Sequence, residues 1–497
     1  MKPRVKVVAL LVALAVVLCS TAATAAKPST PAQSNGRYLV VFKAGTLPSD
    51  ATQRVVNSGG NVVRAFQQIG VVSAIGDAAF AKTIAKDAKV LSVGPEHMFA
   101  APDVQAVELT DDIAVPESAA GPVSGVDTYY SYQWDIRRVG APAVWARLPL
   151  ALTTPRVAVL DVGVMVDLGG VLPNHPDLAG QVDTSVATSY CATGDGYPVY
   201  TTYIDFVAYP TWTPSDGCTA LGANFYQAHG THVAGTIAAK FGGGKVVGVA
   251  PDAKIGAYKV FDAYTVDGIF LKIGAFDGPI FDAIIQATVA GYRVISMSLG
   301  SYGVRNNKDY NASWLAWDRV ANWANRNGAL IVASAGNTPI SLNGTLFHIP
   351  SDLPTVVNTS ATATSQLQVD PPGVYDAAPG SDYLASYSSY GAAVDIAAPG
   401  GDCYPYVPYA SCDSYPEYWI LNDGILEGFN TGQVAYYFMQ GTSMATPHVS
   451  AVAAWVFAMH PDWTPGDVRS WLNTTAEVIG SRQQFGHGMV NADAATQ

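Results

Sequence analysis

Apolar runs of four to seven residues, separated by longer stretches with helical spacing, recur through the second part of the chain. They are rich in β-branched residues and cover 157–160, 255–261, 294–299, 330–334 and 394–397. A strand that is apolar without interruption is buried on both faces, as in a parallel sheet whose connecting helices cover both sides. The pattern therefore predicts an α/β domain over residues 129–497, with three layers and a mainly parallel sheet in the middle.

A different order of elements precedes this domain. The spacing of apolar residues predicts strand, helix, strand, strand, helix and strand, which is the order of a small α+β, ferredoxin-like domain over residues 37–99. Residues 100–128 are rich in proline, glycine, alanine and acidic residues and lack periodicity, which predicts a linker and processing region. The elements expected in the small domain are 37–43, 49–58, 61–66, 71–75, 77–85 and 90–97.

Residues 1–26 have the pattern of an export signal peptide. A basic head precedes an apolar stretch from Val7 to Leu18, and small residues follow as far as Ala26. The apolar stretch is about 12 residues, short of the about 20 that a helix needs to cross a bilayer. Cys19 raises lipid attachment as an alternative, but the large Leu18 before it favours plain cleavage. We expect a secreted, extracellular protein with no membrane anchor after signal removal, in transit through a periplasm where the host has one.

Length and charge restrict the functions that fit. The chain has 497 residues, of which 49% are hydrophobic and only 13% are charged. This length exceeds one ordinary core, so two or more units are expected. With 27 basic and 39 acidic residues the net charge is −12, and no basic stripe interrupts it. Nucleic acids and anionic membrane surfaces are therefore poor candidates for partners.

The cysteines agree with export. Signal removal would leave an even number, four, as expected in an oxidising compartment. Four cysteines allow three pairings, and proximity favours the local ones; buried free thiols are the alternative, while the spacing does not suit a zinc site. The predicted disulfides are Cys191–Cys218 and Cys403–Cys412.

Three short strings carry an acid, an imidazole and a hydroxyl. Asp161 ends the run Val-Ala-Val-Leu-Asp, His229 opens His-Gly-Thr-His-Val-Ala-Gly-Thr, and Ser443 lies in Gly-Thr-Ser-Met-Ala-Thr-Pro-His-Val. A serine hydroxyl needs a neighbouring base to remove its proton, and an acid can orient that base. The order Asp, His, Ser is one of three chain orders of such a triad. The strings resemble those of the subtilisin-like serine proteases, or subtilases, and the resemblance covers residues 130–497.

The resemblance implies a role for each of these residues. Ser443 is the implied nucleophile at the start of a helix, where Pro447 fits because first-turn amides lack intrahelical partners. Of the two imidazoles in His-Gly-Thr-His, the resemblance assigns catalysis to His229, while His232 points into a packed helix. Asp161 is implied to orient the base. A zinc peptidase would need the His-Glu-x-x-His string instead, which is absent.

The resemblance also implies an oxyanion hole and a substrate cleft. Asn337, in Ala-Gly-Asn, would donate its amide to the oxyanion beside the Ser443 N–H; a turn-capping asparagine is the alternative. Two segments would flank the primary pocket and pair with the substrate main chain. We expect this pocket to be open and suited to large apolar side chains. The segments are Ser298, Leu299 and Gly300 on one side, and Ala333, Ser334, Ala335 and Gly336 on the other.

One position departs from the family pattern, and a second leaves it open whether this chain binds calcium as many relatives do. Val162 follows Asp161 where relatives have Ser or Thr, so a hydroxyl that bonds the carboxylate is lost. Asp177 matches a residue that holds structural calcium in many relatives, but the loop 240–248 lacks the expected Asn or Asp and contains Lys245. Calcium takes six to eight oxygen ligands, so we expect that site to be absent or altered. No cofactor is expected for catalysis itself.

The predicted function is that of a secreted, monomeric serine endopeptidase of broad specificity, which cleaves proteins and peptides through an acyl-enzyme. The resemblance further implies that residues 37–99 are an inhibitor propeptide, removed by autoprocessing, whose tail near His97 to Ala101 pairs with Ser298–Gly300. A narrow-specificity processing protease and a non-catalytic binding protein with the same fold are the alternatives. A sedolisin-type carboxyl protease would need Glu in place of His229 and does not fit.

Overall fold

The computed structural model describes fourteen stretches of the chain, and the predicted export signal and all five cysteines lie outside them. The two predicted disulfides therefore remain predictions. No helix among the described residues is long and apolar enough to cross a membrane. The described residues are 36–100, 105–109, 127–150, 153–164, 175–183, 188–189, 202–204, 207–209, 213–214, 228–266, 269–370, 374–402, 420–425 and 434–497.

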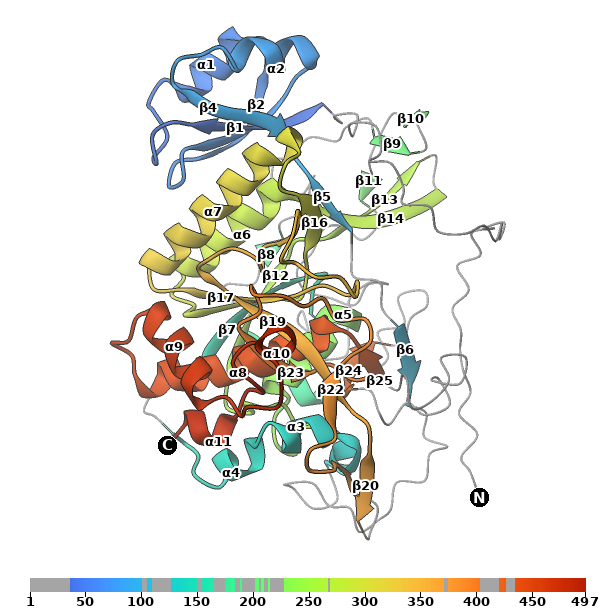
Figure 1. Ribbon diagram of the computed structural model, residues 1–497. Helices are drawn as coiled ribbons and strands as arrows, with labels where there is room; N and C mark the ends of the chain where they lie inside the picture. Colours follow the sequence, from blue (N-terminus) through green and yellow to red (C-terminus); the bar gives the residue numbers. More distant parts are fainter. Residues whose placement is uncertain are drawn as a thin grey trace.

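The N-terminal part forms a separate small layer of sheet and helix, drawn blue at the top of Figure 1. Its sheet is antiparallel in the order β2-β3-β1-β4, which confirms the predicted ferredoxin-like arrangement. Val40, Val55 and Phe80 belong to a core of its own. Its elements are β1 (Arg37–Phe42), α1 (Ala51–Asn57), β2 (Asn61–Phe66), β3 (Val71–Ile75), α2 (Ala78–Ile84) and β4 (Val90–Pro95).

The larger part is built on a sheet whose described strands run in the order β22-β19-β17-β15-β7-β12-β8, with β23 also paired to β19. All of these pairings are parallel except the one between β22 and β19. The predicted mainly parallel sheet is therefore confirmed. Its strands are β7 (Arg156–Asp161), β8 (Thr188–Ser189), β12 (Lys254–Lys259), β15 (Val294–Met297), β17 (Leu330–Ser334), β19 (Val356–Thr364), β22 (Asp382–Leu384) and β23 (Ile396–Pro399).

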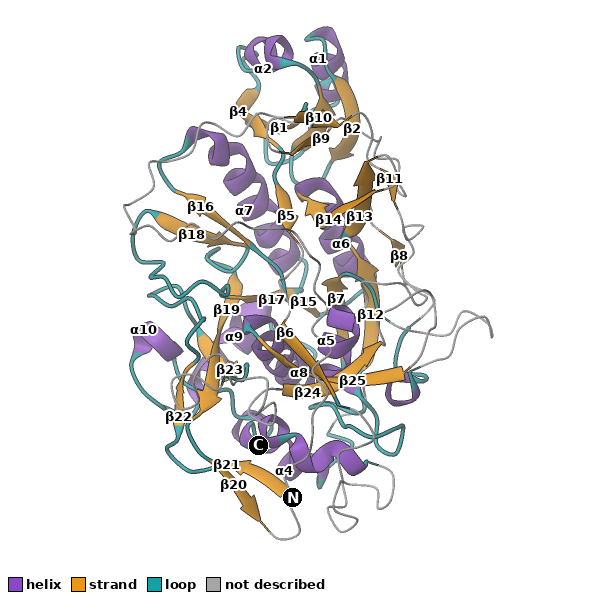
Figure 2. Ribbon diagram, turned by 90° about the vertical axis from the view of Figure 1, so that its right-hand side faces the viewer, coloured by secondary structure: helices purple, strands orange, loops and turns teal. Residues whose placement is uncertain are grey.

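Helices cover both faces of this sheet (Figures 1 and 2). Successive side chains of a strand point to opposite faces. Accordingly, Val157 and Val159 of β7 pack in the cluster with α5 and α8, whereas Ala158 and Leu160 pack in the cluster with α6 and α7. The helices are α3 (Trp134–Arg138), α4 (Ala141–Trp145), α5 (Ala228–Ala238), α6 (Asp277–Val289), α7 (Asn311–Arg326), α8 (Thr442–Met459), α9 (Pro465–Thr475), α10 (Arg482–Phe485) and α11 (Ala492–Ala495).

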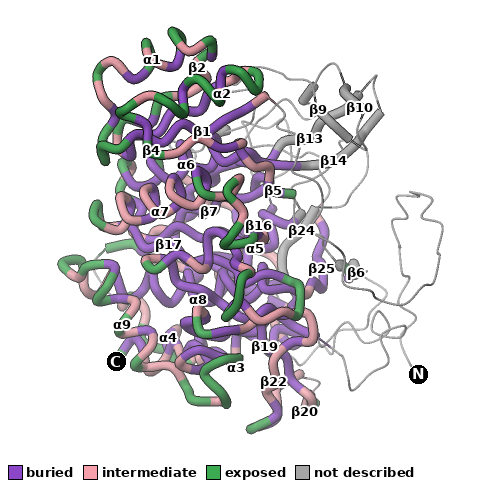
Figure 3. Tube along the Cα trace, turned by 45° about the horizontal axis from the view of Figure 1, so that its top comes forward, coloured by how far each residue is buried: buried purple, intermediate pink, exposed green. Residues whose placement is uncertain are grey.

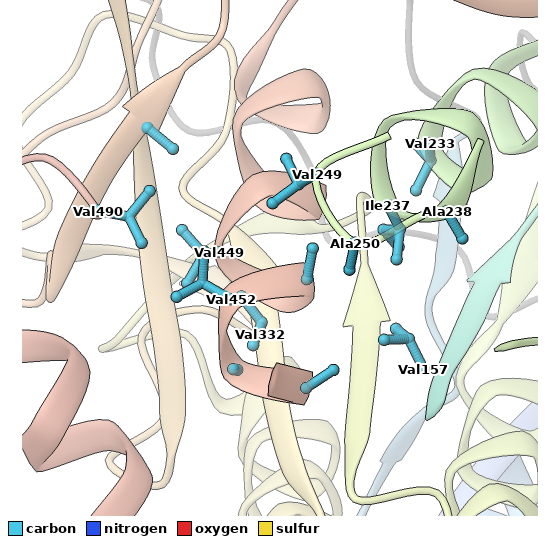
Figure 4. Close-up of a cluster of buried hydrophobic side chains, with 14 of the residues drawn as sticks. Val157, Val233, Ile237, Ala238, Val249, Ala250, Val332, Val449, Val452 and Val490 are labelled. Carbon is cyan, nitrogen blue, oxygen red and sulfur yellow. The ribbon is translucent and has the colours of Figure 1, made fainter. Parts of the chain in front are cut away.

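The helix α8 lies at the centre of the molecule and is buried along nearly its whole length (Figure 3). In the close-up of the core, Val449 and Val452 lie on the side of α8 toward Val490, whereas Val157 of β7 and Ile237 of α5 lie on its other side, and all of them belong to one buried cluster (Figure 4). Each fully buried valine stabilises the fold by about 1.5–3 kcal/mol. The first turn of α8, which carries Ser443, is therefore supported by a closely packed helix.

Smaller sheets and short helices surround this core. Two of these strands, β5 and β6, fall partly or wholly in the region 100–128, whose assignment as a linker and processing region stays a prediction. The remaining strands are β5 (Met98–Ala100), β6 (Gln105–Glu108), β9 (Thr202–Ile204), β10 (Val207–Tyr209), β11 (Thr213–Pro214), β13 (Asp262–Val266), β14 (Ile269–Phe276), β16 (Ser301–Val304), β18 (Leu346–Ile349), β20 (Leu367–Asp370), β21 (Val374–Ala377), β24 (Ile420–Ile425) and β25 (Val434–Gln440), with 3-10 turns at Thr128–Tyr132, Pro176–Leu178 and Lys308–Tyr310.

Candidate active site

Asp161 and His229 form a buried pair at the carboxyl end of an inner strand of the parallel sheet. Asp161 is the last residue of β7, and His229 lies in the first turn of α5. His229 Nδ1 lies 2.8 and 3.0 Å from the two carboxylate oxygens of Asp161. The Val162 backbone N–H donates to Asp161 Oδ1 at 2.7 Å. A main-chain hydrogen bond thus supports the carboxylate where the hydroxyl expected from the family pattern is missing.

Ser443 lies in the first turn of α8, but Pro447 does not. Because α8 begins at Thr442, Pro447 falls in the second turn, contrary to the prediction. Its missing N–H would otherwise bond the carbonyl four residues earlier, which is that of Ser443. The Ser298 hydroxyl donates to that carbonyl instead, at 2.8 Å, and Ser443 Oγ donates to the Ser298 carbonyl at 3.3 Å. The proline thus frees an acceptor that ties the serine to the segment 298–300.

His229 Nε2 is buried and has no hydrogen-bond partner among the residues that the structure describes. It is the ring nitrogen not facing Asp161, and so it is the one able to accept a proton. Ser443 Oγ donates to the Ser298 carbonyl, so a hydrogen bond to this nitrogen would have to replace that one. Hydrogen bonds of this kind are often long or absent without substrate.

The Asn337 side chain is fixed by the residue before Ser443. Its Oδ1 accepts from the Thr442 N–H at 2.9 Å and from Thr442 Oγ1 at 2.7 Å. With the oxygen held in this way, Nδ2 is the atom left to donate. Gly441 lies beside it with a φ of +153°, and a Cβ atom there would come 3.3 Å from Asn337 Nδ2. Sequence reasoning found Asn337 but missed Thr442, which sets its orientation.

A groove of about 460 Å³ runs past Ser443 and Asn337. The structure places Ser298, Leu299, Gly300, Ser334 and Gly336 on its walls as predicted, but Ala333 and Ala335 are fully buried and do not line it. Among several further lining residues, only Thr442, in the Gly-Thr-Ser string, and Ala100, in the predicted tail, lie in segments that the sequence singled out. These further lining residues are Ala100, Tyr302, Thr338, His348, Ser386, Tyr387, Gln440 and Thr442.

The other histidines of the motifs are structural. His232 Nε2 lies 3.0 Å from the Ile420 carbonyl and 3.2 Å from that of Tyr437, and burial lowers the pKa of His232 to about 3. His448 is fully buried, with Nε2 3.0 Å from the Asp135 carboxylate. Both imidazoles hold neighbouring segments together.

The surroundings of Asp177 do not fit calcium. Asp177 Oδ2 accepts from Tyr436 Oη at 2.9 Å and from the Lys245 N–H at 3.3 Å. These are proton donors, and the Lys245 ammonium bonds Tyr129 Oη close by, at 2.8 Å. Calcium needs a shell of oxygen acceptors. Within the described stretches, no group of three or more His, Cys, Asp or Glu is placed to hold a metal ion.

Comparisons with known proteins agree with this geometry. The model of the subtilase family matches residues 153–488. Alkaline elastase YaB from Bacillus sp. (strain YaB) is 30% identical over 398 residues, which are 80% of this chain and 77% of that protein. Subtilisin BL from Lederbergia lenta is 30% identical over 370 residues, 74% of this chain and 99% of that protein.

Solved structures show the same fold. Fervidolysin from Fervidobacterium pennivorans, a keratinolytic enzyme related to subtilisin, superposes with a TM-score of 0.61 at 25% identity, covering 93% of this chain and 60% of that one. An epidermin leader peptide processing serine protease from Staphylococcus aureus superposes with a TM-score of 0.64 at 20% identity, covering 93% and 97%. The chain belongs to the subtilase family and is a serine endopeptidase with the α/β fold of that family.

Proposed function

We propose that this chain is a secreted endopeptidase, made as an autoprocessed zymogen, in which Asp161, His229 and Ser443 form the catalytic triad. The observation that carries the proposal is the buried Asp161–His229 pair, because it leaves one basic ring nitrogen free beside the helix that carries Ser443. Substrates are proteins and peptides in extended form, since the groove walls 298–300 offer main-chain groups for pairing.

The reaction follows from these positions. Ser443 Oγ attacks the scissile carbonyl carbon as its proton passes to His229 Nε2. The carbonyl oxygen becomes an oxyanion, which accepts from Asn337 Nδ2 and the Ser443 N–H. When the C–N bond breaks, His229 returns the proton to the leaving amine, and the acyl group stays on Ser443 as an ester. Water, deprotonated by His229, then hydrolyses the ester, while Asp161 holds the imidazole and stabilises its positive charge.

The N-terminal domain supports the zymogen part of the proposal, because it is docked on α6 and α7 by specific contacts. Glu96 Oε1 accepts from the Gly278 N–H in the first turn of α6 at 2.7 Å. Arg319 of α7 donates to the carbonyls of Ile69 at 3.0 Å and Ala44 at 3.2 Å. An ion pair joins Arg64 to Asp282 of α6.

The tail of this domain reaches the groove, though not by the pairing predicted from the sequence. The strand β5 pairs antiparallel with β14, with Met98 opposite Phe276 and Ala100 opposite Gly274. The prediction of pairing with Ser298–Gly300 is therefore wrong for the described part of the tail. Ala100 nevertheless lines the same groove as Ser298–Gly300. A strand in this place excludes substrate, so the domain would inhibit until it is cut away.

Production of the full-length chain with Ser443→Ala tests the proposal. We expect no labelling by a fluorophosphonate, no hydrolysis of casein and no release of the N-terminal domain, whereas the unchanged chain shows all three. Ser470→Ala, an exposed serine on α9, is the matched control and should behave like the unchanged chain. Casein hydrolysis by the Ser443→Ala protein, purified free of other proteases, would contradict the assignment of the nucleophile.

A further inference from the structure

Two side chains occupy the space between the walls of the primary pocket. A Cβ atom at Gly300 would lie 2.0 Å from His348 Cε1 and 2.4 Å from His348 Nε2. A Cβ atom at Gly336, on the other wall, would lie 2.2 Å from Tyr302 Oη and 3.1 Å from His348 Cδ2. The imidazole and the phenol therefore lie directly against the backbone of both walls. The sequence predicted an open pocket at this place.

These two side chains are held in place. Tyr302 of β16 and His348 of β18 are opposite each other in an antiparallel pair, and their ring centroids are 4.7 Å apart. Tyr302 Oη accepts from the Thr338 N–H at 3.0 Å and bonds Ser389 Oγ at 2.8 Å. His348 Nδ1 bonds Ser351 Oγ at 2.8 Å. The two rings together make these three hydrogen bonds, so neither ring can move aside without breaking at least one of them.

The His348 ring, at the base of the pocket, is also uncharged. His348 is only 3% exposed, and its burial lowers the pKa of the imidazole to about 3. The ring is therefore neutral at the pH where such an enzyme works, and it does not attract an acidic side chain. What the two rings contribute is volume.

We propose that Tyr302 and His348 close the base of the primary pocket, so that the enzyme cleaves after small residues such as alanine, serine and glycine. This specificity rests on the proposed function of the groove. The remaining space, about 460 Å³, is shared along the whole groove from Ala100 to Ser443. The chain itself continues after β5 with Ala101, a side chain of the size that such a pocket accepts.

A series of internally quenched peptides that differ only at the residue before the cleaved bond tests this. One methylene more or less on the substrate side chain that enters a hydrophobic pocket changes discrimination between substrates about 10–200-fold. We therefore expect kcat/KM for alanine to exceed that for leucine or phenylalanine at least about 10²-fold. This measurement uses the unchanged mature enzyme and does not depend on a variant that folds. Equal or better cleavage after phenylalanine would overturn the inference.

The variants His348→Ala and Tyr302→Ala should each enlarge the pocket. We expect the ratio of kcat/KM for phenylalanine to kcat/KM for alanine to rise at least about tenfold, mainly through a lower KM for phenylalanine. His460→Ala, which removes a ring stacked on Trp463 away from the groove, is the control and should keep the original profile. Active enzyme is counted by fluorophosphonate labelling, so partial misfolding does not alter the ratio between peptides. Unchanged profiles in both correctly folded variants would also overturn the inference.

Failure of the proposed peptidase function would give a different result from failure of the proposed specificity. If the mature protein hydrolysed none of the peptides and was not labelled at Ser443, the peptidase proposal itself would fall, and the specificity with it. If labelling and hydrolysis occur but large residues are preferred, the peptidase proposal stands and only the role of Tyr302 and His348 is refuted.

Discussion

The contact between His97 and Asp277 predicts how pH affects inhibition by the N-terminal domain. Asp277 is the first residue of α6 and is fully buried, with Oδ2 accepting from the His97 N–H at 2.9 Å and Oδ1 from Trp317 Nε1 at 2.7 Å. Burial and the neighbouring Glu96 raise the pKa of Asp277 to about 7. Burial lowers the pKa of His97 to about 4, although Asp309 and Glu96 oppose this.

Several other groups face this pair. The Arg37 guanidinium forms a fully buried ion pair with Glu96, at 2.9 Å. The His97 ring stacks on Tyr310, with ring centroids 4.4 Å apart, and its Nδ1 lies 3.8 Å from Asp277 Oδ2. A guanidinium keeps its charge in acidic and neutral solution, so His97 and Asp277 are the groups whose protonation we expect to change on docking.

The two shifts act in opposite directions. To the extent that docking buries Asp277 and brings Glu96 beside it, Asp277 takes up a proton on docking at pH values below about 7, which alone would weaken binding as pH rises. His97 loses a proton between about 4 and its ordinary 6.5, which alone would strengthen binding as pH rises. Each shift amounts to at most about tenfold in affinity per pH unit. From about pH 4 to 6.5 the two effects act in opposite directions, so the net proton uptake on docking is smaller than either effect alone would give.

The assay is the inhibition constant of residues 37–101 on the mature enzyme, measured at several pH values from about 5 to about 6.5, inside the window where the two shifts overlap. The unchanged pair should give a value that changes less with pH than it does with either His97 or Asp277 replaced. With His97→Gln the inhibition should weaken as pH rises, and with Asp277→Asn in the enzyme it should strengthen, each by up to about tenfold per unit. Asp462→Asn, in an exposed position, is the matched control. Equal slopes for all four combinations would refute the reasoning.

Three further predictions follow from the described contacts and the sequence. Asn337→Ala should lower kcat by about 10²–10³ with little change in KM, measured on a peptide substrate; an effect confined to KM would remove Asn337 from the oxyanion hole. Deleting 98–101 from the isolated N-terminal domain should sharply reduce its inhibition in trans, because the strand on β14 is lost; equal potency would mean that the tail does not occupy the groove. Peptide mapping of the secreted protein without reduction should show no free thiol, with each disulfide contributing about 2–4 kcal/mol; a crossed pairing would contradict the local loops. The expected pairs are Cys191–Cys218 and Cys403–Cys412.

The elements that depend on local pattern could be predicted from the sequence. The strand bounds Asn61–Phe66, Val71–Ile75 and Leu330–Ser334 match the prediction, because apolar alternation or continuous apolar runs decide them. Asp161 and His229 are brought together by the parallel sheet, since each lies at or beside the carboxyl end of a strand or the start of the next helix. Such positions recur in open α/β sheets.

What the sequence could not reveal depends on contacts between distant segments. Nothing in the string around His348 shows that its ring reaches Gly300, because that contact is set by the pairing of β16 with β18. The position of Pro447 was mispredicted because even a helix that opens at Ser443 has Pro447 as its fifth residue, beyond the first turn. The pairing of β5 with β14 likewise depends on tertiary placement, because the two strands are far apart in the sequence.

The strand β6 has a consequence for the timing of activation. It pairs with β25 so that Gln105 is opposite Gln440, while β5 ends at Ala100, which lines the same groove as Gln440 and Ser443. A cut between residues 100 and 105 would thus leave both new ends held by backbone hydrogen bonds. Cleavage of the chain and the first turnover of a foreign substrate become separate events, because both strands must dissociate before the substrate can bind. Activation should therefore show a lag, whose length is set by strand dissociation rather than by chemistry.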